Sequence, residues 1–104
     1  ELPFVIGVMG QNQSKPAKGA MAVIQEAQLS MERVPAFRGN VKAVRTDVLV
    51  DKAAEALYPK WRDNFEEWEK TGSDFGSHYM GSAIWFNRIG VAMGEAMTGL
   101  LQAR

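Results

Sequence analysis

Cysteine is absent from this sequence of 104 residues, and histidine occurs only once, at His78. Without cysteine the chain has no disulfide, no thiol nucleophile and no zinc–thiolate site. A single histidine also excludes a metal site built from several imidazoles within the chain. We therefore expect neither a metal ion nor another cofactor.

An excess of charge of one sign and a long apolar run are also lacking. Lysine and arginine number 12, and aspartate and glutamate also number 12. No dense basic run is present, so we expect no nucleic acid partner, which usually requires a basic excess. The apolar run near the start of the chain covers residues 4–9 and is far too short to span a bilayer, so we expect no membrane partner.

The first half of the chain predicts a strand, a helix and a second strand. The apolar run of residues 4–9 ends at Gly10 and is typical of a strand buried on both faces of a parallel sheet. A helix is expected over residues 17–33, ended by Pro35. Residues 41–50 predict the second strand. The expected apolar face of the helix contains Ala20, Val23, Ile24, Ala27, Met31 and Val34.

The second half predicts helices that cover this βαβ unit. Asp51 is expected to be the N-cap of a short helix to Leu57, and Gly72 fits the end of a following aromatic helix. Residues 72–79 have no hydrophobic period and predict a loop, before a last helix from residue 81 or 82 to residue 102. The expected apolar faces are Leu57, Trp61, Phe65 and Trp68 for the aromatic helix, and Phe86, Ile89, Met93, Met97 and Leu100 for the last one.

The predicted fold class is thus α/β, with two parallel strands and three to four helices. Two strands that are apolar on both faces cannot bury each other's edges, and open apolar edges invite aggregation. We therefore expect further strands from an N-terminal segment missing from residues 1–104, which can be a separate chain. The alternative is a homo-oligomer formed through the sheet.

The loop of residues 10–16 lacks the glycine pattern of phosphate-binding and dinucleotide-binding loops. It follows the carboxyl end of the first strand, where open α/β sheets bind ligands. Asn12 and Gln13 are therefore candidate contacts to a polar substrate, and Tyr79 is a further candidate beside the histidine. The aromatic residues Trp61, Phe65 and Trp68 can stack on a sugar, although their helical spacing favours core packing.

His78 lies in the predicted loop, four residues after Asp74. A hydrolytic histidine needs one ring nitrogen held by a carboxylate, so that the other nitrogen can accept a proton. Asp74 is the candidate for that carboxylate. None of the serines lies in a Gly-x-Ser-x-Gly nucleophile turn, and none is marked as a nucleophile.

Residues 78–83 read His-Tyr-Met-Gly-Ser-Ala, and residues 89–97 read Ile-Gly-Val-Ala-Met-Gly-Glu-Ala-Met. Together they resemble the C-terminal end of sialate O-acetylesterase-like proteins, which are SGNH hydrolases related to acetylxylan esterases. Residues 3–10 resemble a central strand of the same family. The resemblance implies a three-layer α/β/α, flavodoxin-like fold, of which residues 1–104 form the C-terminal part of one domain.

The resemblance further implies a carbohydrate O-acetylesterase that acts on an O-acetylated carbohydrate and is often secreted or periplasmic. His78 and Asp74 correspond to the catalytic histidine and acid, although many SGNH enzymes place the acid three residues before the histidine rather than four. The nucleophilic serine and the oxyanion donors have no counterpart here, so we expect the chain alone to be inactive. Two alternatives remain: a non-catalytic carbohydrate-binding or assembly module of the same fold, and an unrelated interaction domain.

Overall fold

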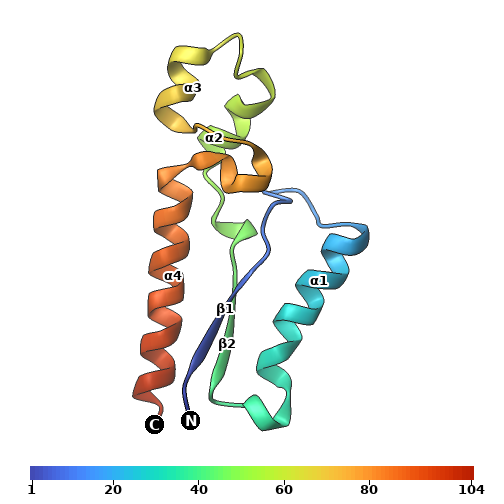
Figure 1. The fold of residues 1–104 in the computed structure, drawn as a ribbon, viewed down its shortest axis with the longest axis vertical. Coiled ribbons are helices and arrows are strands. Elements are labelled where there is room, and N and C mark those ends of the chain that lie inside the picture. The colour runs from blue at the N-terminus through green and yellow to red at the C-terminus, as the bar shows by residue number, and fades with distance from the viewer.

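The computed structural model describes residues 1–104 and contains a two-stranded parallel sheet between helices (Figure 1). Strand β1 spans Phe4–Val8 and strand β2 spans Val41–Arg45, with Phe4 opposite Val41 and Val8 opposite Arg45. The predicted α/β class and the parallel strand pair are confirmed. The helices are α1 (Gly19–Ser30), α2 (Lys52–Leu57), α3 (Phe65–Thr71) and α4 (Ala83–Gln102).

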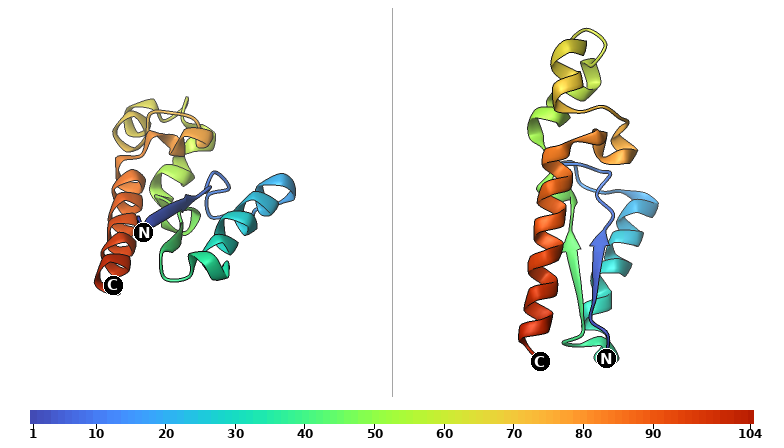
Figure 2. Two further views of the ribbon diagram at one scale, coloured as in Figure 1. Left: turned by 60° about the horizontal axis from the view of Figure 1, so that its bottom comes forward. Right: turned by 60° about the vertical axis from the view of Figure 1, so that its left-hand side comes forward.

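The elements form three layers at one end of the molecule and a helical cap at the other. Figures 1 and 2 show α1 and α4 on opposite sides of the strand pair, and both helices contact both strands. Helices α2 and α3 lie beyond the carboxyl ends of the strands, while both chain termini lie near the amino ends. No helix is long and apolar enough to cross a membrane.

Strand β1 is less buried than the sequence predicts. Val8 is buried, but the side chain of Phe4 is 58% exposed. The Phe4 N–H donates to Asn40 O (2.9 Å), so alternate residues of β1 direct their backbone groups toward β2. Val5 and Gly7 face the opposite edge, where the sheet has no further strand. The expectation of burial on both faces fails because the sheet stops at two strands.

Strand β2 is about half as long as the predicted strand of residues 41–50. A 3₁₀ turn, Asp47–Leu49, follows it. The carboxylate of Asp47 accepts the Val48 N–H (2.9 Å), and such a local side-chain bond competes with extended backbone. On the outer edge of β2, Glu32 accepts the Ala43 N–H (2.8 Å) and so satisfies a donor that another strand would otherwise take.

Helix α1 turns its polar side toward the sheet, contrary to the predicted apolar face. Val23 is 70% exposed and Ile24 is 40% exposed. Gln25 donates to Met9 O (2.7 Å), and Gln28 accepts the Met9 N–H (2.9 Å). These two amides satisfy the backbone at the end of β1, which explains why this face of α1 packs inward. The helix also ends earlier than predicted, with a 3₁₀ turn over Met31–Arg33.

The predicted face of α4 is correct except at its start, where Trp85 is buried in place of Phe86. Trp85 and Leu100 are buried and Ile89 is half-buried, whereas Phe86 is 50% exposed. The Trp85 indole N–H donates to Thr46 O (2.8 Å), so the large ring fills the space between α4 and the end of β2. The two expected ends, the last helix near residue 102 and the aromatic helix at Gly72, are confirmed.

The aromatic segment is not one helix. Pro59 lies in a 3₁₀ turn, Tyr58–Lys60, and α3 begins only at Phe65. This break agrees with the rigid φ angle and missing N–H of proline.

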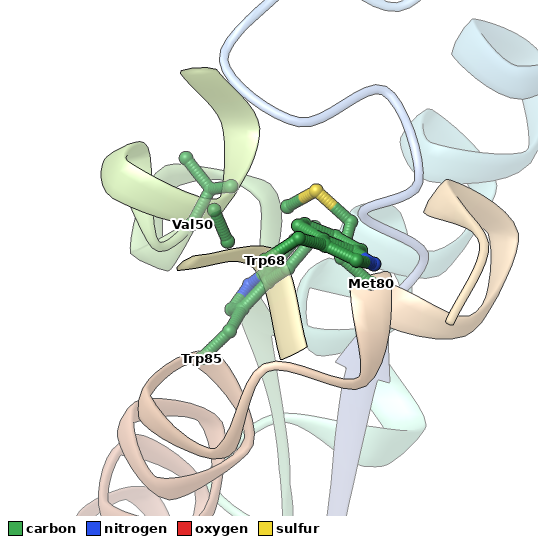
Figure 3. Close-up of a cluster of buried hydrophobic side chains, with 5 residues drawn as sticks. Val50, Trp68, Met80 and Trp85 are labelled. Carbon is green, nitrogen blue, oxygen red and sulfur yellow. The ribbon is translucent and has the colours of Figure 1, made fainter. Parts of the chain in front are cut away.

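The hydrophobic core lies beyond the carboxyl ends of the strands rather than beneath the sheet. Figure 3 shows Val50, Trp68, Met80 and Trp85 packed together there. Met80 and Trp85 are completely buried. The core therefore joins α2, α3, α4 and the loop that carries His78, and it anchors this loop.

Two buried helix caps meet at the edge of this core. Asp51 caps α2 by accepting the N–H groups of Ala53 (3.1 Å) and Ala54 (3.3 Å), as predicted. Ser82 caps α4 by accepting the Trp85 N–H (3.1 Å). The Ser82 hydroxyl donates to the second oxygen of Asp51 (2.8 Å), so a single hydrogen bond joins the starts of both helices.

The chain is open for its size. Its radius of gyration is 15.7 Å, compared with about 13 Å for a compact domain of this length. Its accessible surface is 6734 Å², whereas a compact monomer of 11.5 kDa exposes about 5,800 Å². The excess of about 900 Å² includes the open edge of β1 and the exposed apolar side chains of α1.

Replacing Ser82 by alanine removes the cap of α4 and leaves the second oxygen of Asp51 buried without a partner. We expect the free energy of unfolding to fall by about 1–3 kcal/mol. Urea unfolding followed by circular dichroism measures this change. The control is Ser77→Ala, because Ser77 is exposed in the neighbouring loop. Equal stability of the two variants would contradict the structural role of the cap-to-cap bond.

Candidate functional site

The loop between α3 and α4 carries His78 and lies at the carboxyl ends of the strands (Figure 1). Its 3₁₀ segment, Gly76–Gly81, contains three successive left-handed residues: Tyr79 (φ 55°), Met80 (φ 56°) and Gly81 (φ 59°). For a residue other than glycine this conformation costs on the order of 1–3 kcal/mol. A Cβ atom at Gly81 would also collide with the Ser73 hydroxyl, so glycine is required there.

Hydrogen bonds and burial hold this strained loop. Phe75 O accepts the N–H groups of both His78 (2.9 Å) and Met80 (2.9 Å). Met80 O in turn accepts the N–H groups of Ser73 (2.8 Å) and Asp74 (3.2 Å). Because the Met80 side chain is completely buried, the same residue anchors the loop in the core and fixes the backbone of Asp74.

His78 and Asp74 form the pair that the sequence predicts. The distance from His78 Nδ1 to Asp74 Oδ2 is 3.0 Å. A carboxylate can only accept, so this geometry places a proton on Nδ1, and in the neutral ring Nε2 is then an acceptor. Nε2 makes no hydrogen bond within the chain, and the imidazole side chain is 64% exposed. Nε2 is therefore accessible to a group that approaches from outside.

The carboxylate of Asp74 is held on both oxygens. Asp74 Oδ1 accepts the Phe75 N–H (2.7 Å), while Oδ2 bonds His78. The Phe75 N–H first, and the His78 side chain second, lower the pKa of Asp74 below its ordinary value. Asp74 therefore stays ionised at neutral pH, as a residue that orients an imidazole requires.

No serine of the chain pairs with His78. The Ser82 hydroxyl is buried and donates to Asp51, and the Ser14 hydroxyl donates to Glu55 (2.6 Å). Ser73 and Ser77 are exposed near the histidine, but neither makes a side-chain hydrogen bond to it. The site thus contains a paired histidine and aspartate and no serine hydrogen-bonded to the histidine.

Tyr79, a predicted substrate contact, ties the histidine loop to the strands. Its hydroxyl accepts the Gly10 N–H (3.1 Å) and lies 3.3 Å from the Thr46 hydroxyl. Its ring meets the Trp85 ring edge-on, with 4.6 Å between the centroids. Gly10 lets the end of β1 lie close to the turn after β2, because a Cβ atom there would collide with Thr46 and Asp47. The geometry favours a positioning role for Tyr79.

Asn12, the second predicted substrate contact, is fully engaged within the protein. Its amide nitrogen donates to Lys15 O (2.7 Å) and to Asp47 Oδ2 (3.0 Å). Its amide oxygen accepts from Gln25 (2.7 Å). The geometry thus gives Asn12 the task of shaping the loop of residues 10–16, and its contact to a substrate remains a prediction.

Gln13 is the third predicted substrate contact, and its side-chain amide makes no hydrogen bond. Its backbone is left-handed (φ 60°). Its Nε2 atom would lie 2.9 Å from a Cβ atom at Gly76, so the amide rests against the histidine loop. Of the predicted substrate contacts, Gln13 is the best placed to donate to a ligand beside His78.

Asp47 was not singled out from the sequence, although it orders the loops around the site. It is buried and accepts from Arg45 (2.7 Å), Asn12 and the Val48 N–H. Burial raises the pKa of Asp47, but the hydrogen bond from Arg45 and those from Asn12 and Val48 together outweigh it and lower the pKa. Asp47 comes soon after β2, and Asn12 comes soon after β1, so both lie at the carboxyl ends of the strands. This position is the sequence signal that could have identified Asp47.

A cavity of about 250 Å³ is lined by Asp74 but not by His78. Trp68 forms its floor and is buried, as predicted for core packing. Phe65 lines the same cavity but is 53% exposed, so the aromatic segment is only partly core. The remaining lining residues are Tyr58, Trp61, Glu69, Gly72, Ser73, Asp74 and Phe75.

No group of three or more histidine, aspartate and glutamate side chains is arranged to hold a metal ion. Comparisons of the chain with protein-family models, with curated proteins and with solved structures gave no match.

We expect the Asp74 carboxyl group to titrate below the ordinary aspartate pKa of about 3.9. In His78→Ala the pKa should rise but remain below that value, because the Phe75 N–H still donates to Oδ1. Carbon-13 NMR of the carboxyl groups measures both titrations. An unchanged Asp74 pKa in the variant would show that the two side chains do not interact in solution.

Asp47→Asn should lower the free energy of unfolding by about 1.5–3 kcal/mol at neutral pH, the range for hydrogen bonds to a charged group. The folded-state pKa of Asp47 is lowered, so its stabilisation is present above the ordinary aspartate pKa and lost as the pH falls through the folded value. The difference between wild type and variant should therefore shrink below about pH 4. Urea unfolding from pH 2 to pH 7 tests this, with the exposed residue change Asp63→Asn as control.

Proposed function

We propose that residues 1–104 are the histidine-bearing part of a serine ester hydrolase that removes acetyl groups from carbohydrates. One observation carries this proposal: an exposed imidazole whose Nδ1 is held by an ionised carboxylate at 3.0 Å and whose Nε2 has no partner. The pair lies at the carboxyl ends of parallel strands, where α/β enzymes bind their substrates.

The proposed chemistry is acyl transfer in two steps. A serine from outside these residues attacks the acetyl carbonyl carbon while His78 Nε2 takes its proton. The carbon–oxygen bond to the sugar breaks, and His78 returns the proton to the leaving sugar oxygen. Water then attacks the acetyl-serine with His78 again as base, which releases acetate and restores the serine.

The carboxylate of Asp74 has two tasks in this scheme. It keeps the Nδ1 proton in place, so Nε2 presents its lone pair, and it stabilises the imidazolium that forms in each step. The donors that stabilise the oxyanion would come from the same segment as the serine. Gln13 can add a hydrogen bond to the sugar beside the histidine loop.

The open edge of the sheet supports the proposal that the nucleophilic serine belongs to another segment or chain. The edge of β1 has no neighbour, and about 900 Å² of surface exceeds the value for a compact monomer. This excess is close to the roughly 800 Å² that each partner buries in a standard interface. Exposed apolar side chains on α1 and α4, including Val23 and Val91, flank the same sheet. The resemblance of residues 78–83 and 89–97 to SGNH esterases supports the same completed three-layer fold.

A carbohydrate-binding module without catalysis is the second candidate. It is favoured by the absence of any serine beside His78 and by the aromatic cavity next to Asp74. This candidate requires sugar binding without turnover even when the missing strands are supplied.

The test compares the isolated chain with the complete protein or assembly that carries these residues. The chain alone should not hydrolyse an aryl acetate, whereas the complete form should. In the complete form His78→Ala should lower kcat by at least about 10³-fold, because the serine loses its base. Ser77→Ala, beside the histidine, is the matched control and should retain activity.

Labelling with a fluorophosphonate identifies the nucleophile in the same preparations. The label should attach to a serine outside residues 1–104 and should be much slower in His78→Ala. Near wild-type turnover in that variant would end the esterase proposal. A complete form that binds acetylated sugars without hydrolysing them would favour the second candidate.

A further inference from the structure

The cavity beside Asp74 has the chemistry of a sugar-binding subsite. Three aromatic side chains, Trp61, Phe65 and Phe75, form walls around the buried ring of Trp68 (Figure 3 shows Trp68 in the core). Phe65 is 53% exposed and Phe75 is 66% exposed, so burial in the core does not explain them. The C–H face of a pyranose is apolar and weakly positive, and it suits the negative face of an aromatic ring.

The size of the cavity suits a small ligand such as a single sugar ring. Its volume of about 250 Å³ lies just below the roughly 300–1,000 Å³ of pockets for drug-sized ligands. A few polar groups among apolar walls are typical of pockets that orient a small ligand. Here these groups are the carboxylates of Glu69 and Asp74 and the hydroxyl of Ser73, all of which can accept hydrogen bonds from sugar hydroxyl groups.

The charge of the cavity selects among sugars. Two carboxylates line it and no lysine, arginine or histidine does. Arg62 does not line the cavity, but its guanidinium carbon is 5.2 Å from the centre of the Trp61 ring in the aromatic wall. An anionic sugar would therefore meet like charge without a partner, whereas a neutral pyranose would not.

Asp74 connects the cavity with the proton-transfer site. Its carboxylate lines the cavity and also bonds His78, and the Phe75 ring is 6.3 Å from the imidazole ring. Asp74 is therefore shared by the cavity and the histidine pair, while His78 itself does not line the cavity. Resting on the proposed esterase function, we infer that the cavity between α3 and residues 73–75 binds a neutral pyranose of the substrate and discriminates against carboxylated sugars.

Two probes that differ only at one carbon test the inference on the intact 104-residue chain. They are methyl β-D-glucopyranoside, which is neutral, and methyl β-D-glucopyranosiduronate, which carries a carboxylate. Proton–nitrogen NMR spectra should show the indole signals of Trp61 and Trp68 and the amide signals of residues 73–75 moving with the neutral sugar. The carboxylated sugar should bind at least about fivefold more weakly, from its unpaired charge.

Two variants separate stacking from charge. Phe65→Ala should weaken glucoside binding about 3- to 10-fold, as expected for one aromatic contact. Phe37→Ala is its control, since Phe37 is also an exposed phenylalanine but lies outside the cavity. Glu69→Gln keeps the shape of the side chain and should narrow the difference between the two sugars. Dispersed amide spectra establish that each variant remains folded.

The inference is overturned if neither sugar shifts the cavity signals, if the carboxylated sugar binds as well as the neutral one, or if Phe65→Ala and Phe37→Ala bind alike. Since binding needs no turnover, these results do not depend on the esterase proposal. In the complete protein, Phe65→Ala should lower kcat/KM for an acetylated glucoside about 3- to 10-fold more than it lowers kcat/KM for an aryl acetate. An equal loss of both activities would also contradict a role limited to the sugar.

Discussion

The hydrogen bond between Ser82 and Asp51 is the constraint on which the rest of the structure depends. Both side chains are buried, and each one caps a different helix. The bond therefore fixes the start of α4 against the start of α2, close to the turn that follows β2. The segment from α2 to the start of α4, which contains α3 and the histidine loop, therefore begins and ends at this junction. A buried carboxylate without that hydroxyl would be costly, so each cap stabilises the other.

The histidine loop next to this junction has an unfavourable backbone conformation, which the core stabilises. Tyr79 and Met80 are left-handed, which nothing in their side chains favours. The strain is offset because Met80 fills the core and its carbonyl oxygen binds two N–H groups of the preceding turn. The result is a rigid frame for an exposed pair: Asp74 and His78 lie at the surface, but their backbone is anchored in the interior. Such a frame suits a proton-transfer site, which needs fixed geometry together with access for a substrate.

The sheet end of the molecule has the opposite character. Two strands between two helices leave the edge of β1 open, and the apolar residues of α1 face outward. The well-packed cap and the open sheet support one proposal: the histidine and the cavity are built within this chain, and the nucleophile arrives with the strand that completes the sheet. The cavity next to Asp74 then gives the sugar a place on the chain that carries the base.

Local sequence patterns predicted the order strand, helix, strand, the cap at Asp51, the end of α3 at Gly72 and the approach of Asp74 to His78, because each depends mainly on residues close in the chain. The tertiary structure alone decided the rest. Gln25 rather than Val23 faces the sheet, because the Gln25 amide donates to the Met9 carbonyl oxygen. Trp85 rather than Phe86 is buried, because its indole N–H donates to Thr46 O. The tertiary structure also used the amide of Asn12 and the hydroxyl of Tyr79 to join loops that are distant in the sequence. Hydrogen-bond partners across such distances follow from packing, which hydrophobic periodicity does not record.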